Sequence, residues 1–300
     1  MTHQLVELLL QRQNADGGWG AEAGRKSRTE PTSFALLALA AVGDRSIADA
    51  AERAEKWLAG AQNPDGSWPV GAGLKDGSWT TALASFALAG FEPRRAQAAR
   101  GAQWLLEAQG RSLGWLQSLQ YRWAPQTQVV ELNPDLKGWP WTAGTFSWVE
   151  PTSYALLALK KLLPYLPAGR AHERIREGER LLYDRMCAGG GWNIGNRRVL
   201  GVEQPPYPDI TALALMALAD HRAMEANRRS LLALKRMLAE TTSGLSLSWS
   251  ILCLLIYGED VTEWRQLCAA GYEKTGFLGE TRTVALSAMA LADGARMFRI

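Results

Sequence analysis

A short motif of Gln, Gly and Trp recurs along the chain and limits the folds it can adopt. In the two clearest copies, which begin at Gln13 and Gln62, a Gly and then a Trp follow at the same positions. The Trp residues that end the four recognisable copies are Trp19, Trp68, Trp115 and Trp192. A regularly repeated motif predicts a fold of stacked units, because one such unit cannot bury its apolar face alone.

A second recurring feature is a segment that is apolar on nearly every side. Such segments occupy residues 32–42, 81–88, 152–159, 211–218, 246–257 and 283–291. A helix without a polar face must be surrounded by protein. The intervening segments, such as 48–61 and 168–186, are amphipathic and therefore suit an outer layer. We predict an all-α (α/α)6 barrel, a closed toroid of six helix pairs with the apolar helices inside. An open solenoid is the alternative, but the last apolar segments have no polar capping face.

One long insertion, residues 116–147, interrupts the third unit. It is too long for an ordinary connection. The chain contains 13 Trp but only 6 Phe and 7 Tyr, and aromatic residues are concentrated in and beside this insertion. We expect a single barrel domain over residues 1–300, with 116–147 forming a folded aromatic flap over one mouth.

Composition excludes several classes of function. Lys and Arg number 33 against 30 Asp and Glu, a balance that argues against nucleic-acid binding. The three cysteines, Cys187, Cys253 and Cys268, are too few for a disulfide framework. The three histidines lack metal-ligand spacing with cysteine, so we expect no metal and no cofactor. The chain starts without a signal-like segment and has no apolar run of membrane-spanning length. We expect a cytoplasmic protein, with peripheral membrane contact left open.

The Gln-xxx-Gly-x-Trp units resemble the QW motifs of squalene–hopene and oxidosqualene cyclases. The same helix-pair repeat is found in the β subunits of protein prenyltransferases, and the likeness covers essentially the whole chain. Residues 189–192 and 207–212 resemble the stretch of class II terpene cyclases that contains the proton-donating DxDD aspartates. Residues 138–152 resemble small bacterial proteins of this repeat group.

Departures from these families limit what the resemblance implies. Where a cyclase has DxDD, this chain has Asp209 followed by Ile210, Thr211 and Ala212. The central acid is therefore a threonine, and the same threonine stands where a prenyltransferase has a zinc-binding cysteine. Neither the usual alkene-protonation site nor the zinc site is transferred. Squalene-type cyclases use two barrels and prenyltransferases a second subunit, so the cavity of this single barrel lies inside the ring or is completed by another copy or a partner subunit.

Acidic residues precede several apolar helices: Glu30, Glu150, Asp209 and Glu280. Carboxylates at helix starts are commonly caps, and we favour that interpretation for Glu30 and Glu280. Ring geometry nevertheless points the starts of all inner helices at one mouth. Acids that converge beside apolar surfaces have raised pKa values and can donate protons. Asp209 and Glu150 are the predicted catalytic residues.

Substrate contacts are predicted at the flap and at a basic pair. Trp139, Trp141 and Trp148 stand outside the repeat frame, and could line a cavity or form the flap's own core. Arg197 and Arg198 follow the fourth motif and suit a diphosphate, although a solvated loop is the simpler interpretation. Cys187, in the turn before three glycines, is expected to be inert.

Three functions remain open on the sequence. The first is an isoprenoid-handling enzyme similar to class II terpene cyclases, acting on an isoprenoid or another apolar small molecule. The second is a non-catalytic or accessory barrel that binds a prenyl group or lipid and completes a partner's site. The third is a carbohydrate-active (α/α)6 enzyme with paired carboxylates.

Overall fold

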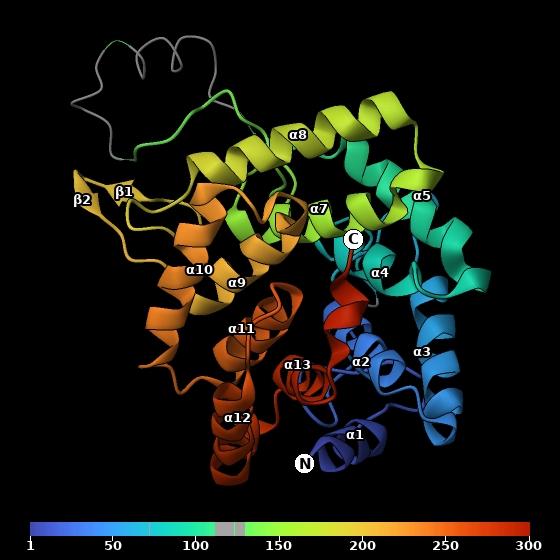
Figure 1. Cartoon of the computed structure of the whole chain (residues 1–300). Coiled ribbons are helices and arrows are strands. Elements are labelled where there is room, and N and C mark those ends of the chain that lie inside the picture. Colours follow the sequence, from blue (N-terminus) through green and yellow to red (C-terminus); the bar gives the residue numbers. More distant parts are fainter. Residues whose placement is uncertain (72, 112–122, 124–129) are drawn as a thin grey trace.

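Six apolar helices stand around a common axis in the computed structural model, which describes residues 1–71, 73–111, 123 and 130–300 (Figure 1). These inner helices are α2 (Thr29–Val42), α4 (Thr80–Leu88), α7 (Val149–Leu162), α9 (Pro208–Ala217), α11 (Gly244–Ile256) and α13 (Thr281–Leu291). Each packs against the next, and α13 packs against α2. The predicted (α/α)6 barrel is therefore confirmed, and the ring is closed.

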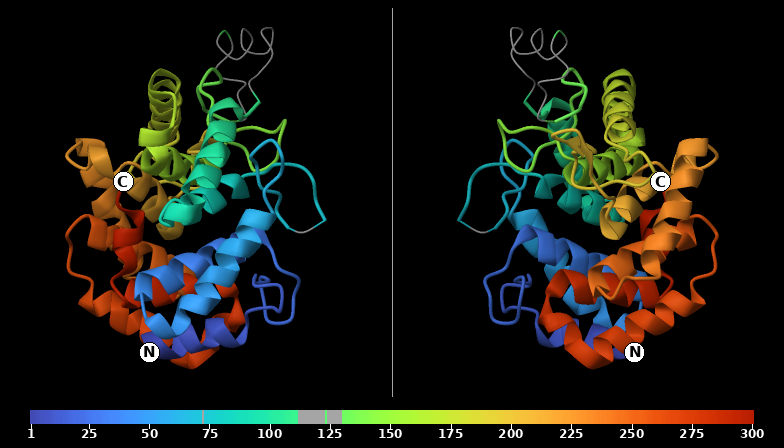
Figure 2. Two further views of the ribbon diagram at one scale, coloured as in Figure 1. Left: turned by 90° about the vertical axis from the view of Figure 1, so that its right-hand side faces the viewer. Right: turned by 90° about the vertical axis from the view of Figure 1, so that its left-hand side faces the viewer.

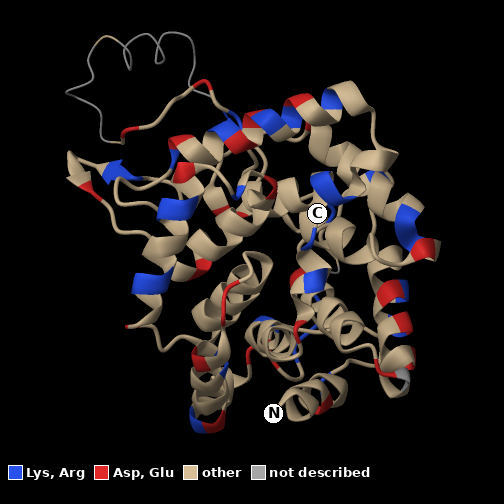
Figure 3. Cartoon of the chain, in the orientation of Figure 1, with Lys and Arg blue, Asp and Glu red and all other residues tan. Residues whose placement is uncertain are grey.

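Six amphipathic helices form the outer layer. They are α1 (Thr2–Gln11), α3 (Ala48–Gly60), α5 (Arg95–Glu107), α8 (Ala168–Asp184), α10 (Glu225–Leu238) and α12 (Thr262–Thr275). Each of the later five packs mainly against the inner helix that precedes it, whereas α1 packs against α13. The first helix thus covers the last one, and charged residues gather on the outer helices (Figure 3).

Short elements connect the helices. A two-stranded antiparallel hairpin, β1 (Arg198–Val199) and β2 (Val202–Glu203), precedes α9. The short 3-10 helices are η1 (Arg45–Ile47), η2 (Glu92–Arg94), η4 (Leu163–Tyr165), η5 (Ala219–His221), η6 (Gly276–Gly279) and η7 (Gly294–Phe298). The long loop at 12–28 and the loop residues 61–71 and 73–79 project from the same end of the barrel (Figure 2). That end is where the inner helices begin.

The repeated Trp residues join each outer helix to the following inner helix. The indole Nε1 of Trp19 donates to the carbonyl of Leu9 in α1, and its backbone N–H donates to Thr32 Oγ1 in α2. Trp68 and Trp192 form the same two bonds in their units. All three side chains are fully buried, so their function is structural.

Trp139 makes this pair of bonds in the third unit. Its Nε1 donates to Leu105 O at 2.9 Å and its backbone N–H to Thr152 Oγ1 at 3.0 Å. The prediction that Trp139 stands outside the repeat frame is therefore wrong. Trp115, the predicted repeat residue, lies outside the described residues. The insertion separates Gln109 from its structural Trp, which explains the misassignment.

Of the predicted flap at 116–147, the structure describes residue 123 and residues 130–147. Val130 forms a bridge with Val199 of β1, and residues 138–147 lead into α7. Its role as a folded flap stays a prediction. In the described part of the chain, no helix is long and apolar enough to cross a membrane.

The C-terminal segment η7 packs against the inner helices α2, α11 and α13. The Phe298 ring of η7 stacks on Phe86 of α4 at 5.4 Å and meets Trp249 of α11 edge-on at 5.6 Å. Lys161 Nζ donates to Met297 O at 2.6 Å and lies 4.5 Å from the centre of the Phe86 ring. We call residues 294–298 the C-terminal plug, because they pack against these inner helices.

Candidate active site

Three carboxylates and a guanidinium converge at the mouth where the inner helices begin. Glu30, Glu150 and Asp209 occupy the first turns of α2, α7 and α9. Arg282 is the second residue of α13. We call these four residues the acid cluster. Closure of the ring brings together side chains from four helices that are far apart in the sequence.

Arg282 is shared by two of the acids. Its Nη1 lies 3.0 Å from Glu30 Oε1 and 3.9 Å from Glu150 Oε1. Burial opposes its charge, but the surrounding acidic groups more than compensate and raise the pKa of Arg282. Its Nε is buried and has no hydrogen-bond partner among the described residues. That Nε lies 4.0 Å from Glu280 Oε1, so the guanidinium of Arg282 is within ion-pair distance of three carboxylates.

Glu150 is the most strongly perturbed carboxyl group of the cluster. Burial raises its pKa to about 7; Arg282 opposes this rise, and the negative charges of Glu30 and Asp209 add to it. The hydroxyl of Tyr154, one helical turn further along α7, donates to Glu150 Oε1 at 3.2 Å. Near neutral pH this side chain is close to half-protonated, which suits it to donate or accept a proton.

Glu30 and Glu280 differ, although both were expected to be caps. Glu280 is a cap: its carboxylate accepts from the backbone N–H groups of Arg282 and Thr283. Glu30 makes no capping bond at the start of α2 and instead accepts from Arg282. The capping prediction is thus confirmed for Glu280 and wrong for Glu30. Burial raises the pKa of Glu30, with Arg282 opposing.

Asp209 lies within electrostatic range of Glu150 and Arg282. Burial raises its pKa, while backbone hydrogen bonds and Arg282 lower it. The two acids predicted from the sequence therefore belong to one cluster. The adjacent Thr211 has a structural use, because its hydroxyl accepts the backbone N–H of Trp192.

Aromatic rings pack against one another inside the ring of inner helices, next to Glu150 and its partner Tyr154. Tyr154 stacks on Trp79 at 5.8 Å and lies 6.2 Å from Trp249 and 6.3 Å from Phe34. We call these four residues the aromatic wall. An aromatic wall beside a proton donor can stabilise positive charge that develops on a substrate.

The predicted substrate-binding Trp residues have three different placements. Trp141 meets Trp79 edge-on at 4.7 Å, which joins it to the aromatic wall. Trp139 is buried in its structural position, although its edge reaches a cavity of about 120 Å³ that Trp79 and Trp141 also line. Trp148 precedes α7, and its ring packs over Gly195. Of the three, Trp141 is the one that both contacts the aromatic wall and lines this cavity.

Arg197 and Arg198 are paired with an acid away from the cluster. Arg197 Nη2 lies 2.9 Å from Glu131 Oε1, and Arg198 Nη1 lies 3.5 Å from Glu131 Oε2. Glu131 thus already offsets part of the charge expected to bind a diphosphate. Cys187 is buried, and burial raises its pKa, which is consistent with an inert thiol.

A second group of ligand-type side chains lies near the carboxyl end of α7. Glu179, Asp220 and His221 place one ligand atom each within 4.8 Å of one another. Lys160 Nζ lies 2.7 Å from Glu179 Oε1 and 2.6 Å from Asp220 Oδ1. The lysine supplies the cation that these carboxylates need, so the group is an ion-pair network between helices.

Sequence reasoning missed Arg282 and Tyr154. A cation in the first turn of a helix opposes the helix dipole, and Arg282 stands directly before the apolar segment 283–291. That mismatch was a usable signal. Tyr154 follows Glu150 by one turn, which places both on one helix face.

No family model and no curated protein sequence matches this chain. Solved structures do match it over almost its entire length. The type II terpene cyclase MstE from Scytonema, in its apo form, superposes with a TM-score of 0.59 at 16% identity, covering 99% of this chain and 97% of that one.

Two glycan-cleaving enzymes are equally similar in fold. An inactive variant of the α-1,6-mannanase GH76A of Salegentibacter sp. HEL1_6, in complex with α-1,6-mannotriose, gives a TM-score of 0.61 at 10% identity, covering 99% and 98% of the two chains. The endo-β-1,4-glucanase CMCax from Acetobacter xylinum gives 0.60 at 13% identity, covering 98% and 97%. At such identities the likeness establishes the fold: an (α/α)6 barrel shared by a terpene cyclase and by glycan-cleaving enzymes.

Proposed function

We propose that this protein is an enzyme that performs acid–base chemistry on an isoprenoid or similar apolar small molecule at the acid cluster. One observation supports this most directly. Glu150, with a pKa raised to about 7, lies at the edge of the aromatic wall beside a carboxylate held by Arg282. A proton donor, an anion and an apolar aromatic surface are the components that a polyene cyclase or isomerase needs.

The proposed reaction is an isomerisation: one proton is added and another is removed, so the elemental composition of the substrate is unchanged. Glu150 donates its proton to an alkene carbon, and the positive charge that forms faces the rings of Tyr154, Trp79 and Trp249. A carboxylate, Asp209 or the ionised Glu150, then removes a proton from a neighbouring carbon. In this proposal the acid comes from α7, because Thr211 on α9 is engaged with Trp192.

The first experiment measures turnover and solvent exchange. Wild-type protein in D2O is incubated with farnesol, geranylgeraniol, their diphosphates and squalene, and the products are analysed by gas chromatography with mass spectrometry. Diphosphates are treated with phosphatase before extraction. We expect a cyclised or isomerised product that contains one solvent deuterium.

A matched pair of variants tests the assignment of the acid. Glu150→Gln should lower the rate about 100-fold, because general acid catalysis is lost. Glu240→Gln, an exposed glutamate beyond α10, should leave the rate unchanged. Consumption of none of these substrates, or equal rates in the two variants, would contradict the proposal. A retained isoprenoid without turnover, detected by native mass spectrometry, would instead favour the accessory lipid-binding barrel.

A carbohydrate-active enzyme is the second candidate. Glu30 and Glu150 both lie near one guanidinium nitrogen, and their environments differ, as the acid and base of a glycosidase require. The same variants should therefore also be assayed on α-1,6-mannan and carboxymethyl cellulose by release of reducing ends. Release that depends on both Glu30 and Glu150 would replace the isoprenoid proposal.

A further inference from the structure

The cavity of about 120 Å³ beside the aromatic wall is lined by tryptophan side chains from three parts of the chain. Trp79 stands at the start of α4, Trp104 lies in α5, and Trp139 and Trp141 precede α7. We call this cavity the tryptophan pocket. The residues that line it all belong to the part of the chain that the structure describes.

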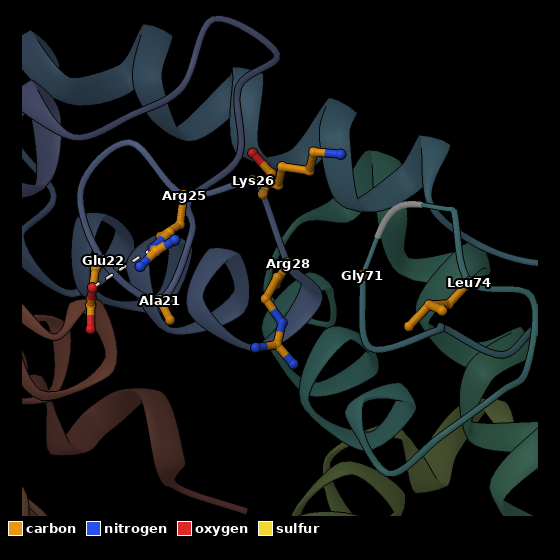
Figure 4. Close-up of a pocket in the computed structure, with 8 residues that line it drawn as sticks. Ala21, Glu22, Arg25, Lys26, Arg28, Gly71 and Leu74 are labelled. Atoms are coloured by element: carbon orange, nitrogen blue, oxygen red, sulfur yellow. Dashed lines mark ion pairs between the residues drawn. The ribbon is translucent and has the colours of Figure 1, made fainter.

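The lining of the tryptophan pocket is uncharged. Its described residues include no Lys, Arg, His, Asp or Glu. Cations do lie at the same end of the barrel, on the loop at 21–28, where Arg25, Lys26 and Arg28 point in different directions (Figure 4). None of these three residues lines the tryptophan pocket. A charged group inside the pocket would lose its water without gaining a partner, so the pocket favours an uncharged group.

Most polar groups of the lining are already bonded to protein. The indole Nε1 of Trp139 donates to Leu105 O, and a side-chain hydrogen bond joins Trp104 to Asp65. Because an indole has a single donor, these two rings have no further hydrogen bond to offer a ligand. The hydroxyl of Ser78 also bonds within the protein. A hydroxyl-rich ligand such as a sugar would find few partners here, whereas a hydrocarbon needs none.

The volume and the burial of the tryptophan pocket limit the size of the group it can hold. Ala82, Leu105 and Trp139 are at most 2% exposed, whereas Ala143 and Gly144 are exposed. The pocket therefore extends from the surface into the packed core. Because an apolar cavity of about 150 Å³ binds benzene, one of about 120 Å³ admits a group of about five carbons. One isoprene unit has this size.

The tryptophan pocket adjoins the acid cluster without including its acid. Pro151, the residue after Glu150 in α7, lines the pocket, whereas Glu150 does not. Trp79 stacks on Tyr154, whose hydroxyl donates to Glu150. The pocket is therefore suited to a part of the ligand other than the reacting carbon. Binding energy from such a remote part can hold the reacting carbon at the acid.

We propose that the tryptophan pocket binds an uncharged hydrocarbon group of about five carbons, which anchors a ligand whose reacting carbon lies at the acid cluster. The identity of that group as an isoprene unit rests on the proposed isoprenoid function. The binding of a small hydrocarbon group by the pocket does not.

Saturation-transfer NMR with the full chain and 2-methyl-2-butene, a branched alkene of isoprene size, tests the pocket itself. Ala82→Leu fills the pocket from its buried side, and Ala108→Leu fills it from a partly exposed side, where overpacking is less of a risk to folding. We expect the wild type to bind the alkene, and both variants to bind it about 10-fold more weakly, because the buried carbons lose their space. Ala96→Leu, at an exposed position of α5, is the matched control and should bind as the wild type does.

Two results would overturn the proposal. The first is that the alkene does not bind, or that all four proteins bind it equally. The second is that tetramethylammonium binds and that both filling variants abolish its binding. The indole rings would then form a cage for a quaternary cation rather than a pocket for a hydrocarbon.

Farnesol tests the isoprenoid part of the proposal separately. Isothermal titration calorimetry should show that farnesol binds more tightly than the alkene, and that Ala82→Leu and Ala108→Leu weaken its binding. Glu150→Gln should bind farnesol as the wild type does, even if no turnover is found, because Glu150 does not line the pocket. Binding of the alkene without binding of farnesol would support the hydrocarbon pocket and contradict the proposed isoprenoid function.

Discussion

Arg282, at the start of the last inner helix, donates to Glu30, at the start of the first, over a distance of 3.0 Å. Two further bonds cross the same seam: the Thr281 N–H donates to Ala21 O, and Arg12 Nη1 donates to Gly279 O. The junction that closes the ring and the centre of the acid cluster are therefore one structure. Changes at this seam should affect stability and chemistry together.

Replacing Arg282 should destabilise the protein in a pH-dependent way. Arg282→Gln leaves the carboxylates of Glu30 and Glu150 without their cation, at a cost of about 1–3 kcal/mol at pH 8. At pH 5 both acids are more often protonated and need the cation less. The loss of stability caused by Arg282→Gln should therefore be smaller than at pH 8. Thermal unfolding at the two pH values measures this, with Arg282→Lys as the charge-preserving control. A deficit that is as large at pH 5 as at pH 8 would show that the guanidinium acts through packing.

Glu150 should make the stability fall as the pH rises through neutrality. Its pKa is raised from 4.5 to about 7 in the folded state. The folded protein therefore binds this proton more tightly than the unfolded chain, and the resulting stability is complete below pH 4.5 and lost as the pH passes 7. Glu150→Gln should remove roughly 3 kcal/mol of this pH dependence. Urea unfolding at several pH values tests it, and parallel profiles for variant and wild type would refute the raised pKa.

Trp139 should behave as a structural residue of the repeat. Trp139→Phe removes the bond to Leu105 O and leaves a small void, which should cost about 1–3 kcal/mol. Trp68→Phe, which breaks the equivalent bond to Leu58 O, should cost a similar amount. Trp141→Phe, at a partly exposed ring, should cost less than either. Chemical denaturation measures the free energy of unfolding of the three variants. If Trp139→Phe is as stable as Trp141→Phe, Trp139 is not a structural residue of the repeat.

Lys161, which bonds to the C-terminal plug, should make the free energy of unfolding increase with pH in the alkaline range. Burial lowers its pKa from 10.5 to about 8, so the unfolded chain binds this proton more tightly. Its contribution to the unfolding free energy then rises between pH 8 and pH 10.5. The difference between Lys161→Met and the wild type should change by up to roughly 3 kcal/mol across that window. A difference that stays constant with pH would mean that the amine keeps its ordinary pKa.

The barrel was predictable because its inner helices are apolar on all sides and must be enclosed. The structural Trp residues could also have been found from a spacing. In three units the Trp precedes its Thr partner by 13 residues, and Trp139 with Thr152 is one of these. The fourth unit, where the β1–β2 hairpin intervenes, has 19 instead.

The acid cluster was only partly predictable, because its central contact is remote in sequence. Asp209 and Glu150 followed from their places before apolar helices. The position of Arg282 at a helix start was a signal, but its contact with Glu30 could not be predicted, since 252 residues separate the two and the last unit lacks the Gln–Trp motif. The capping interpretation of Glu30 was wrong for the same reason, because local sequence contains no sign of a partner that only ring closure supplies.

The contacts between α13 and α2, which close the ring, also limit the order in which the protein can fold during synthesis. A nascent chain that still lacks α13 already has Glu30 and Glu150 but not the guanidinium beside them, and α1 lacks its main packing partner. The earlier helix pairs can assemble during synthesis, yet the acid cluster is complete only when the final pair joins the first. A chain truncated before α13 is therefore expected to lack the assembled acid cluster.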